Sequence, residues 1–224
     1  MCDKNRQKLK EQLKLYLILE TSFIKIPLED FVNQVVDGGV TTIQLRNKYL
    51  AAKTNTRKDY DTGITIKKLI EKKNTLFIVN DRADLANILK ADGVHVGTDD
   101  IPAHIIKKAY PNMIIGYSCH SIDNIEYANS FDADYIGIGA IFPTDTKNDI
   151  KDILGPAELH TLAHKTDIPS VAIGGINQHN LEKNFKKLAK AGISGICISS
   201  AICKSETPYE TTKKIRKIVD NICT

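Results

Sequence analysis

Short apolar runs rich in β-branched residues recur along the whole chain, and each is followed by a turn and a stretch of helical periodicity. Runs of about four to eight such residues are typical of strands, whereas helices place apolar residues three and four positions apart. We therefore predict eight strands, at residues 15–19, 40–45, 75–79, 93–96, 113–117, 134–139, 170–174 and 195–199.

Helical periodicity fills the segments between these runs, and Pro, Asp, Ser or Asn opens several of them, as is usual at helix N-termini. The predicted helices begin near Leu28, Tyr60, Arg82, Pro102, Ile122, Pro156, Gln178 and Thr207. The charged segment 1–12 predicts one additional helix outside this repeating pattern.

Strands that alternate with helices at this spacing form right-handed β-α-β units and a parallel sheet. The strand runs are almost continuously apolar, which is typical of strands buried on both faces. Eight such units favour a closed barrel, so we predict an α/β fold: a (β/α)8 TIM barrel with a short extra N-terminal helix. The sequence shows no linker or low-complexity tract, and residues 1–224 are predicted to form a single catalytic barrel domain.

Composition and charge argue against several classes of partner. The 31 Lys and Arg exceed the 27 Asp and Glu only slightly, and the surplus is spread along the chain rather than clustered as in nucleic-acid-binding proteins. No apolar stretch reaches the roughly 18 residues of a membrane span, and the N-terminus lacks the apolar core of a signal peptide. The 5 cysteines are widely spaced, which indicates reduced thiols in a cytoplasmic protein. A homo-oligomer is compatible with the sequence.

Polar residues gather where the predicted strands end, which is where barrels of this kind build their active sites. They fall into three chemical groups: cations at Arg46, Lys48 and Lys147; carboxylates at Asp81 and Asp100; and exposed backbone amides at Gly174, Gly175, Ser199 and Ser200. Carboxylates that face cations suggest Mg²⁺ bridging a polyphosphate. Amides near helix starts after strands seven and eight are typical of a phosphate site. The sequence thus predicts a diphosphate–magnesium subsite and a monophosphate subsite.

Plainer interpretations exist for each of these residues taken alone. The aspartates could be helix caps, the lysines solvated side chains and the glycines a tight turn. Their occurrence at successive strand ends favours a shared site over independent coincidences. By contrast, His160 and His164 lack the glutamate of a zinc motif, and Cys119 and Cys197 have no neighbour in the sequence that would activate a thiol. His95 ends a strand, and hydrogen bonding is at least as good an explanation for it as catalysis.

Several segments, taken in order and spacing, are similar to the signature segments of the thiamine phosphate synthase family. They are IQLRNK, NDRADLA with ADGVHVGTDDIP, IIGYSCHS, ADYIGIGAIFPTDTK, and AIGGINQHN with SGICISSAI. The resemblance covers about residues 15–203. It implies an enzyme that joins a hydroxymethylpyrimidine diphosphate to a hydroxyethylthiazole phosphate, with magnesium as cofactor and pyrophosphate as the second product.

The resemblance also implies roles for individual residues. The pyrimidine diphosphate would contact Gln44, Leu45, Arg46, Asn47, Lys48, Asn80 and Ser118, and Mg²⁺ would be held by Asp81 and Asp100. The thiazole phosphate would lie against Thr144, Asp145 and Thr146, with its phosphate at Gly175, Ser199 and Ser200. Catalysis would depend on Lys147, Arg46 and Lys48, whose charges stabilise the leaving diphosphate.

Two alternatives remain at this stage. A thiazole tautomerase of the same fold would need a thiazole phosphate site but no diphosphate or magnesium subsite. A non-catalytic phosphate-binding barrel would have no use for both aspartates together with the lysines.

Overall fold

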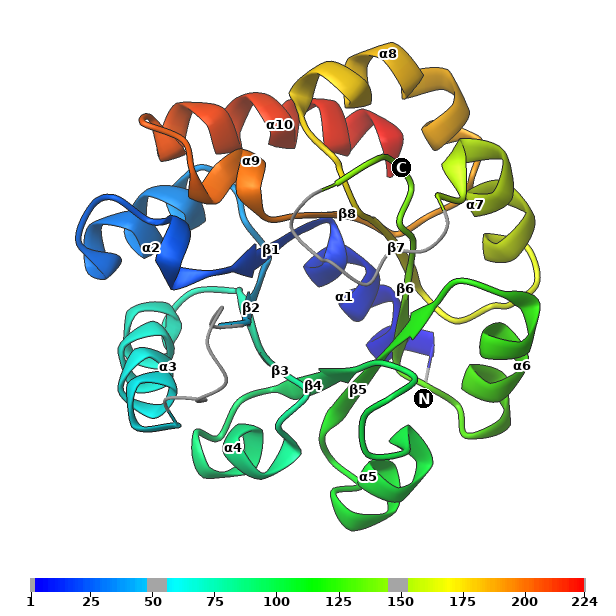
Figure 1. Ribbon diagram of the computed structural model, residues 1–224, viewed down its shortest axis with the longest axis horizontal. Coiled ribbons are helices and arrows are strands. Elements are labelled where there is room, and N and C mark those ends of the chain that lie inside the picture. The colour runs from blue at the N-terminus through cyan, green and yellow to red at the C-terminus, as the bar shows by residue number, and fades with distance from the viewer. Residues whose placement is uncertain (1–2, 48–55, 145–152, 224) are drawn as a thin grey trace.

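The computed structural model describes residues 3–47, 56–144 and 153–223, and its strands form a closed parallel barrel surrounded by helices (Figure 1). The strands are β1 Leu15–Leu19, β2 Thr42–Leu45, β3 Leu76–Asn80, β4 Gly93–Val96, β5 Ile114–Cys119, β6 Tyr135–Ile138, β7 Ser170–Ile173 and β8 Gly195–Ile198. They pair in sequence order, and β1 closes the ring against β8 with Leu17 opposite Ile198. The predicted TIM barrel is therefore confirmed.

The helices lie outside the strands and cover them on all sides (Figure 1). They are α2 Leu28–Asp37, α3 Thr56–Ile70, α4 Ala83–Ile88, α5 Ala103–Ala109, α6 Ile122–Ser130, α7 Gly155–Ala163, α8 Gln178–Ala189, α9 Ser200–Cys203 and α10 Pro208–Ile222, with a 3-10 turn at Thr21–Phe23. The long helix α10 packs against α2 and α8 beside the closure of the barrel. Within the described ranges, no helix is both long and apolar enough to cross a membrane.

Several predicted boundaries need correction. The helix expected near Tyr60 begins at Thr56, and an ion pair between Arg57 and Asp61, one turn apart, supports its first turn. The fifth strand was expected to end at residue 117 but continues to Cys119. The sequence did not predict the four-residue helix α9, which is too short to show a period.

Alternate strand residues face the helices and the barrel interior, as the pleat of a strand requires. In β1, Leu15, Leu17 and Leu19 belong to the apolar core between strands and helices, whereas Tyr16 and Ile18 belong to a second cluster inside the barrel. Some inward positions of the other strands carry polar side chains, which are considered below, and others, such as Ile78 and Val171, are apolar. The two-residue period thus separates the packing face of each strand from its functional face.

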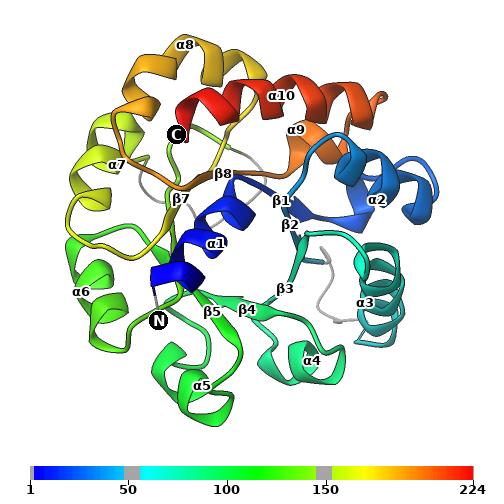
Figure 2. The same cartoon turned by 180° about the vertical axis from the view of Figure 1, so that it is seen from behind.

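The predicted extra helix exists as α1 Asp3–Leu13, and it lies across the N-terminal end of the barrel (Figure 2). Its Leu9 and Leu13 are buried in the interior cluster, together with Tyr16, Tyr135 and other strand residues. Helix α1 therefore closes the end of the barrel opposite to the loops that carry the predicted site residues.

Candidate active site

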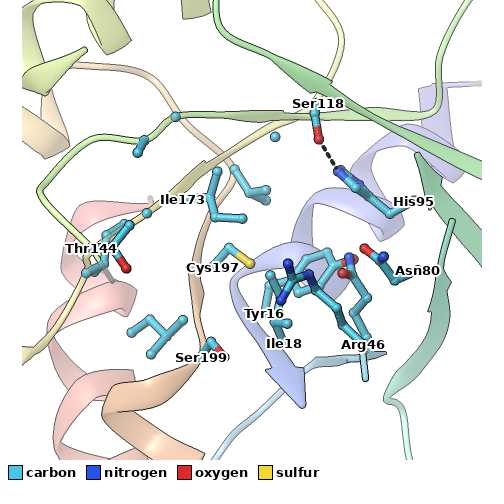
Figure 3. A pocket seen from close by; sticks show the side chains of 18 of the residues that line it. Tyr16, Ile18, Arg46, Asn80, His95, Ser118, Thr144, Ile173, Cys197 and Ser199 are labelled. Atoms are coloured by element: carbon cyan, nitrogen blue, oxygen red, sulfur yellow. Dashed lines mark hydrogen bonds between the residues drawn. The ribbon is translucent and has the colours of Figure 1, made fainter. Parts of the chain in front are cut away.

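A cavity opens at the C-terminal end of the barrel, and all eight strands or the loops after them contribute to its wall. We call it the mouth cavity. It is lined by Tyr16, Ile18, Gln44, Arg46, Asn80, Asp81, His95, Gly97, Asp100, Ser118, His120, Gly137, Gly139, Ala140, Thr144, Val171, Ile173, Gly174, Gly175, Ile176, Cys197, Ile198, Ser199 and Ser200. Figure 3 shows Arg46 and Asn80 on one side of the cavity and Thr144 on the other.

Most of the site residues expected from the sequence meet in this cavity. Those that line it are Gln44, Arg46, Asn80, Asp81, Asp100, Ser118, Thr144, Gly175, Ser199 and Ser200. They lie far apart in the sequence, and the barrel brings them to one end because parallel strands all end on the same side. Four further predicted residues, Lys48, Asp145, Thr146 and Lys147, lie outside the described residues.

Two predicted contact residues, Leu45 and Asn47, direct their side chains elsewhere. Leu45 faces the helices and is buried in the outer core. The Asn47 side-chain oxygen accepts hydrogen bonds from Thr21, and its amide donates to Asp59 at 2.8 Å, so this side chain ties β2 to the 3-10 turn and α3. A role in substrate binding at these two positions stays a prediction, and it would have to use the backbone.

The two predicted metal ligands are fixed by different local structures. Asp81 follows β3 in the left-handed region with φ of 60°, a conformation that Asp tolerates better than most residues, and its N–H donates to the His95 carbonyl at 2.8 Å. Asp100 follows β4, and its Oδ2 accepts the Gly97 N–H at 2.7 Å. The neighbouring Asp99 is exposed and does not line the mouth cavity. Each of the two loops therefore presents one carboxylate to the cavity.

These carboxylates fit a magnesium ion. Mg²⁺ usually binds through one or two carboxylates and takes its remaining ligands from water and substrate phosphates. Among the described residues, no group of three His, Cys, Asp or Glu side chains could hold a metal by itself. Asp81 and Asp100 thus suit an ion that arrives with a phosphorylated substrate better than one held by the protein alone.

The opposite side of the cavity is built from backbone. Gly174 and Gly175 follow β7 with φ of 99° and 64°, which glycine adopts at little cost. A Cβ atom on Gly175 would lie 2.3 Å from the Pro143 carbonyl oxygen, so the turn packs directly on the loop after β6. Ser199 and Ser200 start α9, where the first N–H groups of a helix have no partner within the helix. Such a surface suits an anion.

A chain of side-chain hydrogen bonds crosses the interior of the barrel at the wall of the cavity. Gln44 Nε2 donates to the Tyr16 hydroxyl at 2.7 Å, and the Tyr16 and Tyr135 hydroxyls lie 2.8 Å apart. His95 Nδ1 lies 3.1 Å from the Tyr135 hydroxyl, and His95 Nε2 lies 3.0 Å from Ser118 Oγ (Figure 3). Burial raises the pKa of both tyrosines above their ordinary range, so they keep their protons at neutral pH. We call these five residues the interior chain.

Sequence reasoning missed the two tyrosines of the interior chain. The signal was present, because Tyr16 and Tyr135 are polar-tipped residues at inward positions of otherwise aliphatic strands. For His95 the sequence left structural hydrogen bonding and catalysis open, and its ring nitrogens lie within hydrogen-bonding distance of Tyr135 and Ser118.

The thiols and the histidine pair behave as expected from the sequence. Burial raises the pKa of the Cys119 thiol to about 12 and also raises that of Cys197, so neither is poised to act as a nucleophile. His160 on α7 and His164 at its C-terminal end are exposed and do not line the mouth cavity, and each Nδ1 pairs with a backbone carbonyl.

Comparison with known proteins agrees with the fold. The family model described as thiamine monophosphate synthase matches residues 15–202. The chain is 38% identical to a thiamine-phosphate synthase of Methanococcus maripaludis over 95% of this chain and 97% of that one. It is also 38% identical to one of Pyrococcus horikoshii over 95% and 98% of the two chains.

Solved structures extend the agreement to three dimensions. The thiamine phosphate pyrophosphorylase from Pyrococcus furiosus superposes with a TM-score of 0.83 at 35% identity, over 96% of this chain and 100% of that one. A 3-hexulose-6-phosphate synthase from Salmonella typhimurium, at 16% identity and a TM-score of 0.68, shares the fold alone. From the matched residues 15–202 and these relatives it follows that the chain belongs to the thiamine monophosphate synthase family.

Proposed function

We propose that this protein is a thiamine-phosphate synthase, a transferase that joins a pyrimidine diphosphate to a thiazole phosphate in thiamine biosynthesis. One observation carries the assignment within the family: a single cavity combines two carboxylates beside a cation with an anion-accepting backbone surface opposite them. These are the elements that a reaction between a diphosphate and a monophosphate needs. A tautomerase would have no use for the pair Asp81 and Asp100, and the relatives above are named as synthases.

The pyrimidine diphosphate is assigned to the side of the cavity formed by β2 to β5. Gln44, Ser118, Arg46 and Asn80 line this side. Gln44 and Ser118 would bind the ring, and Arg46 and Asn80 would bind the diphosphate. Asp81 and Asp100 would hold Mg²⁺, which when bound neutralises charge on the diphosphate oxygens. Lys48 and Lys147, outside the described residues, are proposed as further cations for this group.

The thiazole phosphate is assigned to the side formed by β6 to β8. Thr144 lies at the edge of the cavity for the ring, and the phosphate would bind amides at Gly175, Ser199 and Ser200. The proposed contacts of Asp145 and Thr146 belong to the same side. The reacting nitrogen would then face the methylene carbon of the pyrimidine across the cavity.

The reaction forms a bond between the thiazole nitrogen and the pyrimidine methylene while the bond to the diphosphate oxygen breaks. The nucleophile is a neutral ring nitrogen with a free lone pair, so no general base is required. Charge that develops on the departing diphosphate dominates the barrier, and fixed cations such as Arg46 stabilise it best when they are already in place. The cavity accordingly offers charged and hydrogen-bonding groups, and its cysteine thiol at Cys197 stays protonated.

The test is direct synthesis. Purified protein is incubated with both phosphorylated substrates and Mg²⁺, and thiamine phosphate and pyrophosphate are quantified by mass spectrometry and a coupled assay. Equal amounts of the two products are expected, with none when either substrate is omitted. Failure to form thiamine phosphate at saturating substrates would refute the proposal. We also propose a cytoplasmic location, consistent with four unpaired cysteines among the described residues.

A further inference from the structure

The interior chain connects two residues of the cavity wall through residues that are almost inaccessible. Gln44 and Ser118 stand at its ends, on β2 and β5, and both line the mouth cavity. Between them, Tyr135 is fully buried and is absent from the cavity lining, and Tyr16 is 1% exposed. Tyr16 and His95 reach the cavity wall as well, and only Tyr135 has no access to it.

One direction of donation satisfies every link of this chain when Gln44 supplies the first hydrogen. Gln44 Nε2 donates to Tyr16, and in this direction the Tyr16 hydroxyl donates to Tyr135. The Tyr135 hydroxyl then donates to His95 Nδ1, and this direction requires the His95 tautomer with its proton on Nε2. With this direction of donation, every buried donor of the chain has an acceptor. Reversing a single link would place two hydrogens or two lone pairs opposite each other.

The direction of the chain fixes what its ends offer to a ligand. Because His95 Nε2–H donates to Ser118, the Ser118 hydroxyl hydrogen is left to donate into the cavity. Because Gln44 uses its amide nitrogen on Tyr16, its amide oxygen is left to accept. If Gln44 were instead the donor to the ligand and Ser118 the acceptor, the Gln44 amide would have to rotate. Every hydrogen bond of the chain would reverse with it, and His95 would change its tautomer.

We propose that Tyr16, Tyr135 and His95 are positioning residues that hold Gln44 as an acceptor and Ser118 as a donor, and so select the ring of the pyrimidine substrate. The ring that fits presents an amino N–H to Gln44 and a ring nitrogen lone pair to Ser118. A 4-aminopyrimidine has this pattern, and its 4-oxo analogue, with a carbonyl and a ring N–H, has the reverse. The proposal rests on the proposed function, which supplies the pyrimidine ring, and it adds the three residues that hold Gln44 and Ser118 toward that ring.

Local packing supports a specific role for the tyrosine hydroxyls. Gly116 lies on β5 directly beside the link, and a Cβ there would fall 2.4 Å from the Tyr135 hydroxyl and 2.5 Å from His95 Nδ1. The barrel thus leaves room for this hydrogen bond by omitting a side chain. Phenylalanine in place of Tyr16 and Tyr135 would pack equally well in the apolar floor, which includes Leu9 and Ile78, and would avoid the cost of burying two hydroxyls.

The experiment measures discrimination between the two rings. We compare the KM of the 4-amino pyrimidine diphosphate with the inhibition constant of its 4-oxo analogue in the wild type and in Tyr135→Phe. The wild type should prefer the amino ring about tenfold or more, since the oxo ring leaves buried groups mispaired. In Tyr135→Phe the two ends can reorient independently, and the preference should fall at least about fivefold with a smaller change in kcat.

A matched control is Tyr117→Phe, at a buried tyrosine that faces the helices and packs on Tyr127 with ring centroids 5.1 Å apart. Its preference should equal that of the wild type. If Tyr135→Phe does not fold, Tyr16→Phe interrupts the same chain and should give the same loss. A folded variant of either kind with wild-type preference would overturn the inference. A wild type that forms no thiamine phosphate would refute the proposed function instead.

A spectroscopic measurement tests the direction of the chain without turnover. In ¹⁵N-histidine-labelled protein, the imidazole nitrogen shifts of His95 should report a proton on Nε2 in the wild type. Tyr135→Phe should give a mixture of the two tautomers, and Tyr117→Phe should not. A wild-type proton on Nδ1 would overturn the assigned direction.

Discussion

The two ends of the barrel are built from the same eight strands, but one end is apolar and closed, and the other is polar and open. At the N-terminal end, Leu9 and Leu13 of α1 pack on apolar interior residues and close the barrel. At the C-terminal end, the strands run into carboxylates, a cation and glycine turns around an open cavity. The interior chain lies between these layers, with tyrosine rings in the apolar floor and hydroxyls that lead to the cavity wall.

This difference shows that the position of a residue along its strand predicts its role better than its residue type does. In β1, Tyr16 is part of the floor although it carries a hydroxyl, and in β2 Gln44 reaches the cavity although it is 3% exposed. Substitutions at the closed end should therefore change stability, and substitutions at the open end should change activity.

The largest expected effect comes from the closed end. Leu13→Ala removes a fully buried side chain from beneath the barrel and should lower the free energy of unfolding by about 2–5 kcal/mol, without changing kcat per folded molecule. Urea denaturation and active-site-normalised kinetics measure both quantities. The control is Gln7→Ala, at an exposed position of the same helix, with an expected change within about 0.5 kcal/mol. A wild-type stability for Leu13→Ala would mean that α1 is dispensable for the fold.

The open end should show the reverse behaviour. Asp100→Asn keeps an acceptor for the Gly97 N–H but removes the charge, so it should reduce turnover about a hundredfold, or about 3 kcal/mol of transition-state stabilisation, and raise the Mg²⁺ requirement. Steady-state rates across a Mg²⁺ titration give the result, with thermal unfolding to show that the fold is intact. Asp99→Asn, at the exposed neighbour, is the matched control and should stay near the wild-type rate. Equal damage from both would contradict the assignment of Asp100.

Much of the fold follows from the sequence because buried strands and amphipathic helices have local signatures. The run LYLIL predicted β1 with its correct ends, since both faces of the strand are buried and every residue is apolar or aromatic. The placement of α1 could not be predicted, because Leu9 and Leu13 share a buried cluster with Tyr135 and Val171, more than a hundred residues away. Periodicity indicates that a helix has an apolar face but not which surface it covers.

The site was predictable to the extent that its residues end strands. Asp81 and Asp100 were found because a barrel gathers strand ends, whereas Tyr135 begins a strand and carries no motif of its own. The side-chain direction of Asn47 also could not be read from sequence, since it depends on Thr21 and Asp59, which approach only in the folded barrel.

A smaller effect should separate the two sides of the open end. Gly175→Ala places a methyl group against the Pro143 carbonyl at a positive φ, so the turn must shift and the KM for thiazole phosphate should rise about tenfold. The KM for the pyrimidine diphosphate should change little. Gly155→Ala has a comparable φ of 72° with nothing within 4 Å of the added atom, so it controls for backbone strain alone. If both variants raise the same KM equally, the phosphate site lies elsewhere.

The smallest effect is expected from a carboxylate at the open end that does not face the cavity. Asp84, in the first turn of α4, pairs with Arg82 at 2.6 Å, and the hydrogen bonds from Arg82 lower the pKa of this carboxyl. Both side chains are well exposed, so Asp84→Asn should reduce stability at pH 7 by less than about 1 kcal/mol and leave turnover unchanged. Because the pKa is lower in the folded state, this contribution is complete above the ordinary carboxyl pKa of about 4 and disappears as the pH falls through the folded value. Urea titrations of both proteins at pH 7, 5 and 3 should converge at the lowest pH. A difference that grows on acidification, or a large loss of turnover, would show that charge anywhere at the open end matters more than its position toward the cavity.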